Sequence, residues 1–223
     1  MSSLTPLLPL AVGMAISPLP IVAVIAILLS ARGRTAAPIY TATFFAVTLA
    51  AISVGALTAA RASGAAPGGG RVVVIVLGAL LTVGFSAMAI LSWRGRPKPG
   101  ATPTAPGWLS AMDAITPARA AGLGLLMAAT NSKNLPLELK GGALIGAAHL
   151  ALPVAALVCV AVAVVGSLTL ILPTALGATG SSRVVAALDR LKGEMIEHNA
   201  VIMTVLFAVL AANEAAHLVH HLV

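Results

Sequence analysis

Two short polar interruptions stand inside otherwise apolar, uncharged stretches, and they hold the residues best suited to binding a ligand. The first is Ser17-Pro18-Leu19-Pro20 and the second is Asn131-Ser132-Lys133-Asn134-Leu135-Pro136. Serine or asparagine close before proline fits a helix N-terminus, so each interruption predicts the start of a half-helix. Free N–H groups at such a terminus attract anions, and Lys133 adds a full positive charge. The predicted substrate-binding residues are Ser17, Pro18, Pro20, Asn131, Lys133, Asn134 and Pro136.

Each interruption also has a purely structural interpretation. Pro18 and Pro20 would then only kink a helix so that it packs against its neighbours. Lys133 would extend its amine towards the membrane surface, or would pair with Glu138. Substrate contact is the interpretation that we favour for both interruptions.

Further ionisable residues are candidates for gating or coupling. Glu138 and Lys140 are two positions apart and do not face each other on a helix. We favour an interfacial position for both over a proton relay. Asp113 and Arg119 fit either a salt bridge in a connector or an inner gate, and His198 and Asn199 fit a polar helix cap. The predicted gating or coupling residues are Asp113, Arg119, Glu138, Lys140, His198 and Asn199.

The spacing of Glu214, His217 and His221 places them on one face of a helix. This face is interpreted as an interfacial one, and neither a metal site nor a cofactor is predicted. The sequence contains no phosphate-binding glycine loop, serine nucleophile motif or paired cysteines, so it does not predict an enzyme. Cys159 is the one cysteine and cannot form an intrachain disulfide.

The composition indicates an all-α integral membrane protein. Hydrophobic residues make up 59% of the chain, charged residues 9%, and the mean hydropathy is +1.05. The net charge of +7 comes from short loops between apolar stretches, without the basic stripe and stacking aromatics of a nucleic-acid-binding protein.

A membrane-spanning helix needs about 20 mainly apolar residues, and six stretches meet this length. They cover residues 4–30, 36–60, 72–93, 119–149, 151–173 and 198–219, with the first and fourth broken at the two interruptions. Polar segments separate them at 94–119 and 174–196. The second of these segments predicts a short amphipathic surface helix with Ser182 as its N-cap.

The distribution of basic residues predicts the orientation. With both termini outside, three loops that hold nine of the 13 basic residues face the cytoplasm: Arg32, Arg34, Arg94, Arg96, Lys98, Arg119, Arg183, Arg190 and Lys192. Three spans precede the central connector and three follow it, so the two halves cross the membrane in opposite senses. We therefore expect a single membrane domain over 1–223, with inverted repeats at 1–93 and 119–223 joined by a connector at 94–118.

Several segments resemble the actinobacterial GAP family, the glycopeptidolipid- and sulfolipid-addressing proteins of the lysine-exporter (LysE) superfamily. The similar segments are Ala15–Ile25, Trp108, Met112–Gly124, Asn131–Asn134 and His198–Met203. Ser132 stands where the family usually has proline, and Glu138-Leu139-Lys140 is more charged than the corresponding family segment. The resemblance implies a six-span exporter-type fold in the bacterial inner membrane and a role in moving cell-envelope lipids.

The leading hypothesis is a transporter, or a transport accessory, for an anionic or glycosylated envelope lipid, driven by a proton gradient or by a partner enzyme. The first alternative is an exporter of a small anionic or zwitterionic solute. The second is a scaffold that couples lipid-synthesis enzymes to export without carrying substrate. Membrane lipids are the expected surroundings, and the small-residue helix faces are compatible with a homodimer.

Overall fold

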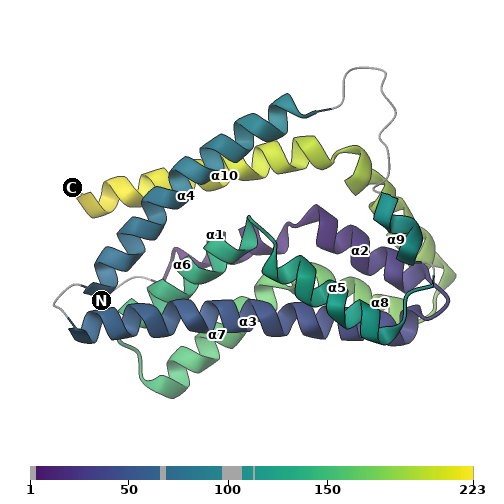
Figure 1. Cartoon of the computed structure of the whole chain (residues 1–223), viewed down its shortest axis with the longest axis horizontal. Helices are drawn as coiled ribbons and strands as arrows, with labels where there is room; N and C mark the ends of the chain where they lie inside the picture. Colours follow the sequence, from purple (N-terminus) through teal and green to yellow (C-terminus); the bar gives the residue numbers. More distant parts are fainter. Residues whose placement is uncertain (1–3, 66–68, 97–106, 113, 223) are drawn as a thin grey trace.

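The computed structural model describes residues 4–65, 69–96, 107–112 and 114–222. These residues form a bundle of α-helices with one 3₁₀ turn and no strand, which confirms the all-α prediction for the described part of the chain (Figure 1). The elements are α1 (Leu7–Ala15), α2 (Pro18–Leu29), α3 (Gly33–Ala65), α4 (Gly69–Arg94), η1 (Gly107–Met112), α5 (Pro117–Ala129), α6 (Asn134–Ala147), α7 (Leu152–Gly166), α8 (Leu168–Ala178), α9 (Ser182–Glu197) and α10 (Asn199–Leu222).

The first predicted break is present between α1 and α2, whose axes differ by 47°. Ser17 has an extended backbone (φ −128°, ψ 93°) and precedes Pro18, the first residue of α2. Proline fits that position because its ring fixes φ and because it has no N–H to leave unsatisfied. Ser17 is therefore the N-cap residue, as predicted, although its hydroxyl makes no capping bond to α2.

The second predicted break separates α5 from α6. Helix α5 ends at Ala129, Thr130 is its C-cap, and α6 begins at Asn134. The expectation that Asn134 caps this helix is wrong, because Asn134 is the first helical residue and Lys133 is the N-cap; the N–H of Asn134 donates to Asn131 Oδ1 (3.1 Å). Pro136 lies in the first turn of α6, where a missing N–H costs little.

The fifth predicted span is also broken, which the sequence analysis did not anticipate. Helices α7 and α8 meet at Ser167 with a bend of 65°. A glycine–serine pair is a recurrent site of sharp helix bending, and Gly166–Ser167 is such a pair. A Cβ atom on Gly166 would lie 3.2 Å from the Cβ of Met14, so glycine lets α7 approach the end of α1 closely.

Three described helices are long and apolar enough to cross a membrane, namely α3, α4 and α10. The bent pairs α1–α2 and α7–α8 raise the number of candidates to five if each pair is one span. The pair α5–α6, expected as another span, is not among them. Large apolar side chains are exposed on the outside of the bundle, among them Leu8, Val83, Leu152 and Leu157. Such a surface is typical of contact with lipid rather than with water.

Buried apolar side chains form two main clusters, and the breaks lie between them. Helices α1, α6 and α7 contribute to one cluster together with α10, whereas α2, α5 and α8 contribute to the other together with α3. Each broken pair therefore places one half in each cluster. The level between the clusters is where the backbone of all three pairs leaves the helical conformation.

Glycines allow α3 to pack closely along α6. A Cβ atom on Gly142 would lie 2.0 Å from the carbonyl oxygen of Ile52, and one on Gly146 would lie 2.1 Å from that of Ala56. Only glycine fits at such distances from backbone atoms. Helices α4 and α10 form a second packed pair, seen along the upper edge of Figure 1. Helix α1 contacts α6 of the first pair and α10 of the second.

The predicted surface helix is α9, which is longer than expected and reaches Glu197. Its N-cap is Ser181 rather than Ser182, because Ser182 already has helical geometry. Leu188 is its one buried residue, and the remaining positions are exposed or half-buried. This agrees with an amphipathic helix on the surface of the bundle.

Candidate functional site

The broken end of α1 is held by side chains from the second half of the chain. Three successive carbonyls lose helical partners there, those of Gly13, Met14 and Ala15. They accept hydrogen bonds from Lys133 Nζ, from Asn134 Nδ2 (3.1 Å) and from Thr169 Oγ1 (2.6 Å), respectively. Buried carbonyl groups need such partners, above all in a membrane. The break in the first span is thus satisfied by α8 and by the break between α5 and α6.

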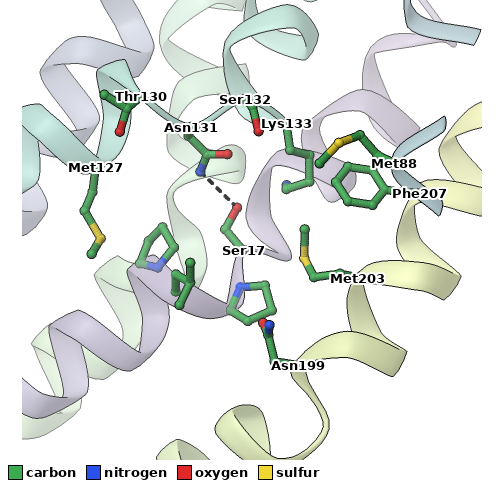
Figure 2. Close-up of a pocket in the computed structure, with 13 residues that line it drawn as sticks. Ser17, Met88, Met127, Thr130, Asn131, Ser132, Lys133, Asn199, Met203 and Phe207 are labelled. Atoms are coloured by element: carbon green, nitrogen blue, oxygen red, sulfur yellow. Dashed lines mark hydrogen bonds between the residues drawn. The ribbon is translucent and has the colours of Figure 1, made fainter. Parts of the chain in front are cut away.

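A polar network joins the two breaks directly. Ser17 Oγ donates to Asn134 Oδ1 (3.1 Å), and Asn131 Nδ2 donates to Ser17 Oγ (3.4 Å). Figure 2 shows the second of these bonds, with Ser17 and Asn131 pointing toward each other. Ser17 and Asn134 are buried and Asn131 is half-buried. Two segments more than 110 residues apart in sequence therefore form one polar centre.

The predicted free N–H groups at the two half-helix starts are largely unavailable to a ligand. At α6, the N–H of Asn134 donates to Asn131 Oδ1 and that of Leu135 donates to the Asn131 carbonyl. At α2, Pro18 and Pro20 have no N–H. Anion binding by backbone amides alone is therefore disfavoured, and Lys133 becomes the principal positive group of the centre.

A cavity of about 330 Å³ lies at the polar centre (Figure 2). Of the predicted binding residues, Ser17, Pro18, Pro20, Asn131 and Lys133 line it. Asn134 and Pro136 do not line the cavity. Asn134 accepts a hydrogen bond from Ser17, which does line it. Asn199, predicted as a gating residue, also lines the wall. The structure thus brings together most of the residues that the two sequence interruptions single out.

Seven further residues that line the cavity are not among the predicted binding or gating residues. These are Leu19, Met88, Met127, Thr130, Ser132, Met203 and Phe207. Met88 comes from α4, while Met203 and Phe207 come from α10. Methionine and phenylalanine are ordinary in an apolar span, so only the tertiary packing of α4 and α10 identifies them as cavity residues. The cavity therefore combines polar groups from the two breaks with apolar side chains from α4 and α10.

Among the described residues that line the cavity, Lys133 is the only cationic one, and it is buried, with 2% of its surface exposed. Its amine donates to the Gly13 carbonyl at the C-terminal end of α1, where a positive charge interacts favourably with the helix dipole. The charge of Glu138 also interacts with it through space. The predicted pairing with Glu138 is therefore not a direct hydrogen bond, and the alternative in which Lys133 reaches the membrane surface is wrong.

Glu138 and Lys140 do not reach an interface, so that prediction is also wrong. Glu138 is fully buried and accepts a hydrogen bond from Thr48 Oγ1 (2.9 Å). Lys140 is 3% exposed and forms an ion pair with Glu214 of α10. The reason is that α6 is enclosed by α1, α3 and α4 rather than lying shallow.

Glu214 is likewise buried, which corrects the interfacial interpretation of its helical face. An acidic residue inside an apolar span normally has a buried partner, so the sequence signals that Glu214 needs one, but only the structure shows that the partner is Lys140. Among the described residues, no group of three histidine, cysteine or acidic side chains is arranged to hold a metal ion.

The remaining predicted gating residues lie apart from the polar centre or outside the described part. Arg119 is exposed at the start of α5, and Asp113 lies outside the described residues, so their pairing remains a prediction. His198 is exposed at the end of α9, with Nδ1 3.5 Å from Glu194 Oε2. It does not line the cavity, whereas its neighbour Asn199 does.

The arrangement is suited to noncovalent binding of an amphiphile with a negatively charged or polar head. Comparisons with curated proteins and with solved structures found no match. The family model described as "Sap, sulfolipid-1-addressing protein" matches residues 7–217 of this chain. This match covers nearly the whole sequence and includes both breaks and every cavity residue. The chain therefore belongs to the sulfolipid-1-addressing protein family.

Proposed function

We propose that this protein exports an anionic or glycosylated cell-envelope lipid across the inner membrane and binds its head group in the cavity at the two breaks. The observation that carries the proposal is the position of Lys133. It is a buried cation in the wall of a cavity formed where two interrupted helices meet. Ionisable residues at membrane depth usually mark a substrate or ion pathway. Paired broken helices are the usual surroundings of a transporter's binding site.

The dimensions and chemistry of the cavity support a head group rather than a whole lipid. A volume of about 330 Å³ lies near the lower end of the range for ligand sites, roughly 300–1,000 Å³. Ser17, Asn131 and Lys133 would contact the charged or sugar part. Met88, Met203 and Phe207 would contact the beginning of the acyl chains, which would remain in the bilayer. The family's description names a sulfolipid, so a sulfated head group is the first to test.

The proposed architecture is six membrane crossings in two inverted repeats, 1–93 and 119–223, with the connector 94–118 in the cytoplasm and both termini outside. Three relationships support it. The breaks α1–α2 and α5–α6 contact each other, the third helices of the two halves, α4 and α10, pack together, and α3 contacts α7 and α8. These contacts are the ones that a two-fold axis between the halves would produce. The bend at Ser167 has no counterpart in α3, which is continuous.

Native mass spectrometry on gently extracted protein tests the proposal. Wild type is compared with Lys133→Ala, and with Lys192→Ala as a control that removes one positive charge from the surface helix α9. A co-purifying anionic lipid should be present in wild type and in the control, and absent or at least tenfold reduced in Lys133→Ala. A loss of one buried charge-assisted contact of about 1.5–3 kcal/mol corresponds to a reduction of this size.

A matched pair of probes makes the test independent of what co-purifies. Purified protein is exchanged into vesicles that contain either sulfated galactosylceramide or galactosylceramide, which differ only in the sulfate. Binding of the sulfated lipid alone, dependent on Lys133, supports the proposal. Equal binding of both lipids, in wild type and in Lys133→Ala alike, would show that Lys133 does not recognise the head group. If Lys133→Ala exports lipid normally in cells while deletion within 94–118 abolishes export, the scaffold hypothesis replaces the transporter.

A further inference from the structure

Glu138 is a buried carboxylate that the proposed head-group site does not use directly. It lies on α6 five residues after Lys133, the N-cap of that helix, and none of its surface is exposed. Thr48 of α3 donates a hydrogen bond to one of its oxygens, Oε1, at 2.9 Å. The other oxygen, Oε2, has no hydrogen-bond partner among the residues that the structure describes. A buried carboxylate with an unpartnered oxygen is costly unless a cation lies nearby or a proton neutralises it.

Lys133 is the cation whose charge interacts through space with that of Glu138. The elements packed around α6 are α1, α3, α4, α5 and α7, and the one ionisable residue of α5 is Arg119, exposed at its far end. Helix α1 has no ionisable residue, α7 has only Cys159, and α4 has only Arg71 and Arg94 near its ends. On α3 the ionisable residues are Arg34, Tyr40 and Arg61, of which Tyr40 donates to the Pro20 carbonyl. Lys140, on α6 itself, is paired with Glu214 of α10.

The same lysine lines the head-group cavity, so its positive charge can interact either with Glu138 or with a bound anion. When the cavity is empty, the charge of Lys133 compensates that of Glu138. An anion bound at Lys133 is neutralised by that lysine in place of Glu138. It also adds a second negative charge close to Glu138. Like charges in an apolar environment cannot both persist at low cost, and the carboxylate is the one that can accept a proton.

We propose that Glu138 is a proton-binding site linked to the head-group site, so that binding of an anionic lipid at Lys133 is accompanied by uptake of one proton at Glu138. This inference rests on the proposed function. The proton comes from water and bonds to a carboxylate oxygen of Glu138. The sulfate ester keeps its charge, because it stays ionised throughout the accessible pH range. The site is therefore neutral in both states: Lys133 and Glu138 cancel each other before binding, and Lys133 and the sulfate cancel each other after it, with Glu138 protonated.

The linkage has a defined sign. Where Glu138 is ionised in the free protein, binding requires a proton, and affinity falls by up to tenfold for each unit of rising pH. Where Glu138 is already protonated, affinity no longer depends on pH. Isothermal titration of the purified protein with a water-soluble sulfated galactosylceramide of short acyl chain, in two buffers of different ionisation enthalpy, measures the number of protons taken up. We expect up to one proton per bound ligand in the pH-dependent range.

Two variants assign the proton to Glu138. Glu138→Gln keeps the shape and removes the titrating group, so uptake should vanish and affinity should become independent of pH. Thr48→Val removes the donor that stabilises the ionised carboxylate, so uptake should remain and the pH-dependent range should move to higher pH. Thr48→Val keeps the carboxylate in place, so it tests whether Glu138 takes up the proton even if Glu138→Gln does not fold. Asp189→Asn on the surface helix α9 is the control and should behave as wild type.

The contrary outcomes are distinct. Uptake that persists in Glu138→Gln assigns the proton to Lys133 and overturns the inference, and uptake that disappears in His198→Gln assigns it to that exposed histidine with the same consequence. Binding of the sulfated lipid in wild type without proton uptake, measured over about pH 5 to 9, overturns the linkage but leaves the proposed function intact. If the sulfated lipid does not bind at all, the proposed function fails, and the linkage fails with it.

Discussion

Lys133 donates a hydrogen bond to the main-chain carbonyl of Gly13, a residue 120 positions earlier in the chain. This contact joins the start of α6 to the broken end of α1. It also places the one cation of the cavity at a helix C-terminus, where the dipole favours positive charge. The lysine therefore has a structural function in addition to the proposed one, and the two can be separated by measurement.

Replacing Lys133 with methionine should destabilise the protein. The substitution removes the donor to Gly13 and the charge that balances Glu138, at a cost of about 1–3 kcal/mol for the unsatisfied buried groups. Thermal unfolding in detergent, followed by circular dichroism, measures the effect. Lys133→Arg should recover part of the stability, because a donor and a charge remain. Lys192→Met on α9 is the control, and surface changes of this kind stay within about 0.5 kcal/mol. An unchanged melting temperature in Lys133→Met would contradict the structural role.

The buried ion pair between Lys140 and Glu214 should show strong coupling. Removing one partner leaves the other charged and buried, which typically costs about 3–5 kcal/mol. Glu214→Leu and Lys140→Met should each destabilise by that order, whereas the double variant should recover most of the loss. Unfolding free energies of the four proteins provide the double-mutant cycle. Additive effects of the two single variants would show that the pair is not an energetic unit.

The ion pair also shows what sequence reasoning could and could not supply. The breaks at Ser17 and at Asn131–Lys133 were predictable, because proline and cap-forming residues inside an apolar span act locally. The bend at Ser167 was missed although Gly166–Ser167 is a recognisable local signal. The partners of Gly13, Glu138 and Lys140 were beyond local reasoning, because each lies on a helix distant in sequence. Met88, Met203 and Phe207 carry no local signal at all.

The close contact between α3 and α6 predicts opposite effects for two glycine-to-alanine substitutions. In Gly142→Ala the new methyl group would meet the Ile52 carbonyl and force the helices apart, with a destabilisation of about 1–3 kcal/mol. In Gly84→Ala on α4 the methyl group meets nothing within 4 Å, so the variant should gain about 0.5–1 kcal/mol from the higher helix propensity of alanine. Thermal unfolding of both in one detergent distinguishes them. A stable Gly142→Ala would mean that the two helices are not in close contact.

The proposed orientation makes a prediction that needs no ligand. Cys159 is the one cysteine, so a Cys159→Ala background allows single-cysteine labelling. Arg61 and Arg183 are both exposed, and the proposal places the first outside and the second in the cytoplasm. In right-side-out membrane vesicles, a membrane-impermeant maleimide should label Arg61→Cys at once and Arg183→Cys only after permeabilisation. Five crossings, without one by α5–α6, would place Thr5 and Glu197 on the same side of the membrane, whereas six place them on opposite sides, so labelling of Thr5→Cys and Glu197→Cys completes the test. Thr5→Cys should be labelled from outside, and Glu197→Cys should be protected like Arg183→Cys. Labelling of Arg183→Cys or Glu197→Cys in intact vesicles would mean that α5–α6 does not cross the membrane. That result would contradict the inverted-repeat proposal.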